Sequence, residues 1–364
     1  MSRGPVGMVA TRMGLMVSLG AGCGAKSAEE GVCPEGVIAI VGTGEWVTLE
    51  SAIAARESLS SADPDAEIEL CPGTFESRTL VEGSGEGFGR IKLRGHPDGT
   101  VLDGDGAGTV LTFIGDGVVE LSDLTITNGY ADAGGGGYRG QGSQTLILDQ
   151  VRFQNNEAPI DGGAVRMYAD DGGSVAIEDA GGGGAVFEDN RAGGDGGAIA
   201  LYGEGFATFN PGTWTLNTNV AGGRGGAVVL QSAASVGMFG DFIATGNEAG
   251  DEGGVVFVQG TNSAGMVLGR VDAFDNRAAG KGGVIRLADG GSGDLALSSG
   301  DIQGNVASGG GAIAATRGWS VTVSGTAFSN NEPEDVLYAG ERYNAHTLAG
   351  AFVCTADAGC SNAE

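Results

Sequence analysis

One short phrase occurs six times in the chain, and this repeat limits the folds that are open to it. Each copy begins with an asparagine and ends with paired glycines, which Ala or Val and then Val or Ile follow. Successive asparagines are 34, 29, 28, 29 and 29 residues apart, at Asn156, Asn190, Asn219, Asn247, Asn276 and Asn305. A fixed period of this size is typical of repeat architectures, in which one coil of chain stacks on the next.

Apolar residues alternate with other residues after each Gly-Gly pair. The first of them is β-branched in every copy, at Val165, Ile199, Val228, Val256, Ile285 and Ile313. Such period-two alternation indicates a strand with one buried face. Two further short apolar runs precede the next asparagine in most copies. Three strands and three turns per repeat predict a parallel β-helix, an all-β fold of about ten coils spaced ~4.8 Å apart.

The regular spacing of the repeats also predicts roles for the asparagines and glycines. We expect the six asparagines to form one structural column, in which each amide hydrogen-bonds to its copy in the neighbouring coil. The paired glycines suit a turn with positive φ, or one too crowded for a Cβ. The 73 glycines among 364 residues would also suit a disordered low-complexity tract, but such tracts lack in-register apolar columns. Glycine at this density disfavours an α-solenoid.

The tetrapeptides of the repeat carry a family resemblance. Gly-Gly-Ala-Ile together with Phe-x-x-Asn, as in Phe153–Asn156, Phe187–Asn190 and Phe328–Asn331, resembles the repeats of chlamydial polymorphic outer membrane proteins. More broadly, residues 35–345 resemble bacterial right-handed parallel β-helix proteins of the pectin-lyase-like type. The resemblance implies a right-handed β-helix at the outer membrane or cell surface. We expect no autotransporter barrel after the repeats.

The N-terminal residues are typical of a targeting segment. Residues 1–23 combine an arginine-bearing start, an apolar run and the small-residue sequence Leu-Gly-Ala-Gly-Cys, which resembles a bacterial lipoprotein signal. This predicts lipidation of Cys23, with residues 24–34 as a tether; the alternative is an ordinary cleaved signal of a secreted protein. Residues 47–62 carry apolar side chains at helical spacing, and we expect this helix to cap the first coil.

Four cysteines remain when Cys23 is set aside as the lipid site. An even number suits two disulfides in an oxidising compartment, and the sequence permits three pairings. We favour Cys33–Cys71 and Cys354–Cys360, because each pair then joins one end of the solenoid. Residues 346–364 would form the disulfide-stapled C-terminal end. A metal site is the weaker interpretation, because the two histidines lack ligand spacing.

The charge balance narrows the range of partners. There are 46 acidic and 19 basic residues, a formal net charge of −27, which argues against nucleic acid. Acidic turns, such as Asp170-Asp171, Asp251-Glu252 and Asp103-Gly-Asp105, could hold Ca²⁺, although isolated acidic pairs are usually solvated. We expect no other cofactor.

The remaining question is whether the chain is an enzyme. Arg90-Ile91-Lys92 resembles a tripeptide of polygalacturonases, but its usual acidic and histidine partners are missing. No recognisable constellation of catalytic residues occurs elsewhere in the sequence. We therefore predict a non-catalytic, exported, lipid-anchored β-helix that acts as a structural or adhesive module. Its partner would be a polysaccharide or another cell-surface component. The alternative is a lyase or glycoside hydrolase acting on acidic polysaccharide.

Overall fold

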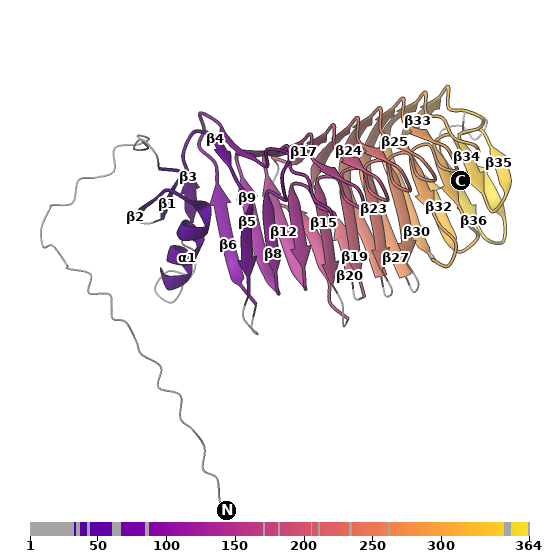
Figure 1. Cartoon of the computed structure of the whole chain (residues 1–364). Coiled ribbons are helices and arrows are strands. Elements are labelled where there is room, and N and C mark those ends of the chain that lie inside the picture. The colour runs from indigo at the N-terminus through magenta and orange to yellow at the C-terminus, as the bar shows by residue number, and fades with distance from the viewer. Residues whose placement is uncertain are drawn as a thin grey trace, which may run out of the picture. The chain divides into compact units, whose positions relative to one another are not determined.

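Each repeat forms one turn of a parallel β-solenoid, and the turns stack along one axis (Figure 1). The computed structural model describes residues 33, 37–41, 44–59, 67–83, 87–169, 172–180, 183–204, 206–209, 212–232, 235–260, 263–345 and 351–362. The helix and strands described belong to the unit Glu35–Glu364. The predicted all-β parallel solenoid is confirmed.

One wall of the solenoid is an eleven-stranded sheet that contains the strand after each Gly-Gly pair. Ten of its strands are parallel to one another. This number agrees with the prediction of about ten coils. These strands are β5 (Thr79–Glu82), β8 (Leu111–Ile114), β11 (Tyr138–Gln141), β15 (Val165–Ala169), β19 (Ile199–Gly203), β23 (Val228–Ser232), β26 (Val256–Gly260), β29 (Ile285–Leu287), β31 (Ile313–Ala315) and β34 (Val336–Tyr338), and the antiparallel β35 (Glu341–Tyr343) ends the sheet.

A 21-stranded sheet forms the other long walls. In chain order its strands are β1 (Ala39–Val41), β2 (Gly44–Trp46), β3 (Ile68–Leu70), β4 (Gly73–Glu76), β6 (Gly89–Arg94), β7 (Thr100–Asp103), β9 (Gly117–Ser122), β10 (Leu124–Thr127), β12 (Gln144–Asp149), β13 (Val151–Gln154), β16 (Val175–Asp179), β17 (Ala185–Glu188), β20 (Phe206–Phe209), β21 (Thr213–Asn217), β24 (Ser235–Thr245), β27 (Ser263–Phe274), β30 (Gly293–Gln303), β32 (Trp319–Val323), β33 (Thr326–Ser329), β36 (Phe352–Thr355) and β37 (Gly359–Asn362).

The coil differs in detail from the three strands that the sequence predicts. A fourth strand of two residues follows the column asparagine in five coils: β14 (Glu157–Ala158), β18 (Arg191–Ala192), β22 (Val220–Ala221), β25 (Glu248–Ala249) and β28 (Arg277–Ala278). In addition, β20 and β21 both pair with the single strand β24, so two strands of the earlier coils become one continuous strand there.

The predicted apolar columns are confirmed by the strand register. Val165, Ile199, Val228, Val256, Ile285 and Ile313 are direct partners along the eleven-stranded sheet. All six are fully buried in the common core. Aromatic rings stack in the same way, as between Phe153 and Phe187, whose centroids are 5.1 Å apart. Burial of these columns is the main favourable contribution to folding.

The asparagines form one buried column that runs along the solenoid. In the middle of the column, Asn219 Nδ2 donates to Asn247 Oδ1 at 2.9 Å and to the Phe187 carbonyl at 3.0 Å. Its own Oδ1 accepts from the backbone nitrogen and Nδ2 of Asn190. A seventh member, Asn331, continues the column and donates to Asp335 Oδ1 at 2.9 Å. The amides therefore connect successive coils in one direction.

The two glycines of each pair meet different constraints. The first is left-handed, as at Gly225 with φ of 63°. The second has an ordinary φ but no room, because a Cβ at Gly226 would lie 2.1 Å from the carbonyl oxygen of Gly254 in the next coil. A Cβ at Gly225 would also lie 2.2 Å from the Val228 carbonyl oxygen, so crowding applies to both members of the pair and positive φ to the first.

A short helix covers the N-terminal end of the solenoid, as predicted. Helix α1 (Leu49–Leu59) packs Leu49, Ala52 and Ile53 into the core. The Thr48 hydroxyl accepts a hydrogen bond from the Ser51 nitrogen and caps the helix start. Across the described ranges, no helix combines the length and the apolar character that crossing a membrane requires.

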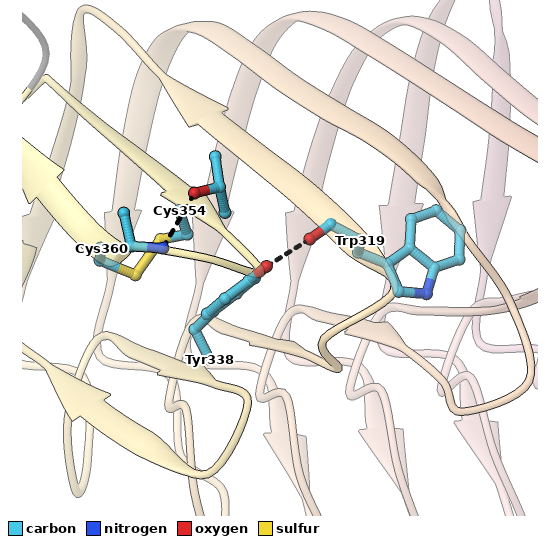
Figure 2. Close-up of a disulfide and its surroundings, with 6 residues drawn as sticks. Trp319, Tyr338, Cys354 and Cys360 are labelled. Carbon is cyan, nitrogen blue, oxygen red and sulfur yellow. Dashed lines mark hydrogen bonds between the residues drawn. A yellow bond between two sulfur atoms is a disulfide. The ribbon is translucent and has the colours of Figure 1, made fainter.

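The C-terminal end is closed by antiparallel strands. Strand β36 pairs with β32 and with β37, and the Cys354–Cys360 disulfide joins β36 to β37 (Figure 2). Tyr338 donates its hydroxyl proton to the Trp319 carbonyl at 2.6 Å beneath this hairpin. Cys33 and Cys71 are also disulfide-bonded. Their pairing with each other stays a prediction.

Removing one amide from the middle of the column should destabilise the fold. Asn219→Ala removes the donor to the Phe187 carbonyl and the acceptor of the Asn190 nitrogens. This should lower the unfolding free energy by about 1–3 kcal/mol. Denaturant unfolding of purified protein measures this loss. Asn217→Ala, only two residues away on β21, is the matched control and should lose far less. Equal stability of Asn219→Ala and wild type would contradict a structural role.

Candidate functional site

A groove of about 620 Å³ lies on the outer face of the eleven-stranded sheet. Four successive strands, β15, β19, β23 and β26, supply its floor, and the preceding loops supply one rim. Its lining residues are Asp161, Arg166, Tyr168, Asp195, Tyr202, Gly203, Glu204, Arg224, Gln231, Ser232, Gln259 and Gly290. Because strand residues alternate between the two faces of a sheet, this polar lining coexists with the apolar core behind it.

Three positions of the repeat form the groove and the sheet face around it. The residue immediately before the Gly-Gly pair is Asp161, Asp195 and Arg224 in three successive copies. A second row lies three residues after the second glycine of each pair. It consists of Arg166, Ala200 and Val229, which are register partners on neighbouring strands. Two residues further on, a third row consists of Tyr168, Tyr202, Gln231 and Gln259. Groups from different repeats therefore meet at the spacing of adjacent strands.

Arg224 is fixed at the centre of the groove by the preceding coil. Its backbone nitrogen donates to Asp195 Oδ1 at 2.7 Å and its Nε donates to Asp195 Oδ2 at 3.0 Å. The hydrogen bond to Asp195 raises the pKa of Arg224, although burial acts in the opposite direction. The guanidinium carbon also lies 4.5 Å from the centroid of the buried Phe257 ring. Ion pair and ring together hold this cation in one orientation.

Arg166 lies between two tyrosines further towards the N-terminus. Its guanidinium carbon is 5.7 Å from the Tyr168 ring centroid and 5.8 Å from that of Tyr202. One terminal nitrogen donates to the Ala133 carbonyl at 3.2 Å. Its buried Nε has no hydrogen-bond partner among the described residues. The arginine therefore contacts both phenol rings.

Tyr202 is held in its protonated form. Burial raises the pKa of its hydroxyl, and the charges of Asp161 and Asp195 and a hydrogen bond to Asp161 raise it further. Asp161 Oδ1 also accepts from the Asp195 nitrogen at 2.8 Å. Both carboxylates are thereby tied to neighbouring coils. The groove offers fixed donors and acceptors, which suit a ligand rich in hydroxyl groups.

The residues singled out from the sequence lie elsewhere. Asn156, Asn190, Asn219, Asn247, Asn276 and Asn305 are at most 1% exposed and do not reach the groove. Cys23 lies outside the described residues. The Arg90-Ile91-Lys92 strand is held by ion pairs, with Arg90 and Lys92 both against Glu120 and with Ile91 in the core. These three residues therefore contribute to the packing and ion pairs of strand β6.

The acidic turns considered for calcium are placed as follows. Asp103 accepts hydrogen bonds from the Asp105 nitrogen and from Asn128 Nδ2. Glu252 accepts from Arg286 Nε at 3.0 Å. Asp170 and Asp171 lie outside the described residues. Within the part of the chain that the structure describes, no three His, Cys, Asp or Glu side chains gather in a metal-holding group.

Sequence reasoning missed the groove, although a signal for it was present. The residue before Gly-Gly is charged in five of the six copies: Asp161, Asp195, Arg224, Glu252 and Lys281. The sign of this charge varies from copy to copy, whereas the apolar columns keep their character. Three members of this row, Asp161, Asp195 and Arg224, line the groove.

The protonated state of Tyr202 predicts a pH dependence. An unfolded tyrosine ionises near pH 10, whereas the folded pKa of Tyr202 is higher. Above about pH 10 the unfolded chain therefore loses a proton that the folded chain keeps, and the unfolding free energy falls as the pH rises towards the folded pKa. In urea unfolding, Tyr202→Phe should lose less stability than wild type between about pH 9 and pH 11. Parallel losses in the two proteins would show that Tyr202 ionises normally.

Comparison with known proteins finds one family. A family model described as the Chlamydia polymorphic membrane protein (Chlamydia_PMP) repeat matches residues 184–202, the segment that contains β17, Asn190 and all but the last residue of β19. The searches of curated proteins and of solved structures found no match. The repeat match and the β-solenoid fit a surface β-helix protein, and the chain carries a repeat of the chlamydial polymorphic membrane protein type.

Proposed function

We propose that the protein is a non-catalytic surface module that binds an extended carbohydrate in the groove of the eleven-stranded sheet. The supporting observation is the set of fixed polar side chains drawn from four successive coils around Tyr168 and Tyr202. Sugars present hydroxyl groups at their edges and C–H groups on their faces. Amides, carboxylates and guanidinium groups satisfy the former, and aromatic rings pack against the latter.

The dimensions of the groove favour a polymer over a small ligand. Its lining extends from β15 to Gly290, which follows β29, and so spans five adjacent strands. At ~4.8 Å per strand this is roughly 20 Å. A chain that lies along the solenoid axis would meet equivalent positions in each coil. The net charge of −27 disfavours a polyphosphate chain such as nucleic acid in this place.

The alternative function is a carbohydrate-active enzyme, which the two carboxylates in the groove would favour. Glycoside hydrolysis needs one carboxyl group to donate a proton and a second to attack or to activate water. Asp195, however, is paired with Arg224, and Asp161 accepts from both Tyr202 and the Asp195 nitrogen. These contacts use the carboxylates to shape the groove. Binding without cleavage is therefore the function we favour.

Polysaccharide titrations would test the binding. Purified mature protein should bind at least one polymer of a panel of acidic and neutral polysaccharides by isothermal calorimetry. Tyr168→Ala combined with Gln231→Ala should weaken that binding about tenfold or more, because each lost contact contributes about 1 kcal/mol. Tyr130→Ala combined with Gln303→Ala is the matched control, since both side chains are exposed and neither lines the groove.

Two results would contradict this proposal. Unchanged affinity in the groove variant would remove the groove as the binding site. Release of reducing ends or unsaturated products, with or without Ca²⁺, that is lost in Asp161→Asn or Asp195→Asn would establish the enzyme instead.

We also propose that a lipid on Cys23 anchors the module at the bacterial outer membrane or cell surface. The resemblance of residues 1–23 to a lipoprotein signal supports this. Cys23→Ser should move the protein from the membrane fraction to the soluble exported fraction and leave the precursor unprocessed by the lipoprotein peptidase. A wild-type protein that is already wholly soluble after export would refute the anchor and favour a secreted protein.

A further inference from the structure

A second cavity, of about 260 Å³, lies on the same face of the solenoid closer to its C-terminal end. Strands β29, β31 and β34 and the turns beside them form it. Its lining residues are Lys281, Arg286, Asp289, Ala315, Thr316, Arg317, Leu337, Ala339 and Gly340. Three of these nine carry a positive charge, in a chain that has only 19 basic residues against 46 acidic ones.

Arg286 forms the fixed base of this cavity. It is only 4% exposed, and its Nε donates to Glu252 Oε2 at 3.0 Å. One terminal nitrogen donates to the Leu287 carbonyl at 2.7 Å, and the other lies 3.9 Å from Asp289. These contacts hold the buried guanidinium in one orientation.

Two exposed cations come to the same cavity from different coils. Lys281 precedes the Gly-Gly pair before β29, and Arg317 lies in the turn after β31. Neither forms an ion pair with any of the described residues. Since their charges repel one another, placing them together costs free energy unless an anion lies between them.

The local charge is positive even though the chain is strongly acidic. Lys281, Arg286 and Arg317 provide three positive charges, and Glu252 and Asp289 are the two carboxylates in ion-pair contact with them. Charges further away are screened over about 8 Å at physiological ionic strength. The apolar walls at Ala315, Leu337 and Ala339 strengthen the remaining field.

We propose that this cavity binds an oxyanion, a carboxylate or sulfate group, between Lys281 and Arg317 and above Arg286. Ammonium and guanidinium donors match the oxygens of such groups. The cavity adjoins the groove, because Asp289 lines the cavity and the next residue, Gly290, lines the groove. The oxyanion could therefore be an acidic substituent of the polymer in the groove or a free anion.

Titration with inorganic anions tests the site without any assumption about the groove. Sodium sulfate and sodium acetate would be titrated into the purified mature protein at constant ionic strength. We expect saturable binding of at least one anion, weakened about tenfold or more in the Lys281→Gln/Arg317→Gln double variant. Arg270→Gln is the matched control; Arg270 is an exposed arginine on β27 that does not line the cavity. The absence of saturable binding to wild type, or equal binding by the double variant, would overturn the proposal.

Oligosaccharides distinguish the two sources of the anion. A uronic-acid oligosaccharide and its carboxyl-reduced, neutral counterpart would be compared on wild type and on the double variant. A preference for the acidic form that disappears in the double variant assigns the site to the polymer. Equal affinity for both forms, with anion binding retained, assigns it to a free anion. Tyr168→Ala should leave inorganic anion binding intact, so failure of the groove would not imply failure of this site.

Discussion

The hydrogen bonds between stacked asparagines fix the position of each coil from Asn156 to Asn331 relative to the next. Each amide donates towards the C-terminal neighbour and accepts from the N-terminal one, so the column has a direction and needs a different partner at each end. At the start, the Gly129 nitrogen donates to Asn156 Oδ1. At the finish, the carboxylate of Asp335 accepts from Asn331. A carboxylate suits that place because the last amide has only a donor left to satisfy.

The same column requires a sharp turn just before it. The residue that precedes each asparagine is left-handed, with φ between 51° and 69°, at Asn155, Asp189, Thr218, Gly246, Asp275, Gly304 and Asn330. Asparagine, aspartate and glycine tolerate this conformation, whereas a β-branched residue such as Thr218 does not favour it. The Thr218 hydroxyl donates to Asp189 Oδ1 at 2.6 Å, which offsets part of that cost.

Features that recur identically in every repeat could be predicted from the sequence, and those made by residues that differ from repeat to repeat could not. Alternation and spacing predict the strands, the register of Val165 with Ile199, and the asparagine column. The last coil lacks the repeat phrase because Pro333-Glu334 stands where the paired glycines would be before β34. Asp335 takes the place of the following Ala or Val, and its carbonyl accepts from the nitrogens of Ala312 and Ile313. The groove could not be predicted from the sequence, because Asp195 and Arg224 are 29 residues apart and form their ion pair only once the coils are stacked.

The charged position before Gly-Gly has a consequence for how such a surface can change. The apolar core uses the inward side chains and the asparagine column, whereas Asp161, Asp195, Arg224, Glu252 and Lys281 lie outside that core. Three of these side chains also accept hydrogen bonds from other coils. Each of these coils contributes one such charged side chain, spaced ~4.8 Å from the next, in the order of the sequence. A substitution that keeps these hydrogen bonds, or insertion of a whole coil, would change the order of charges that a long ligand meets while the apolar core stays the same.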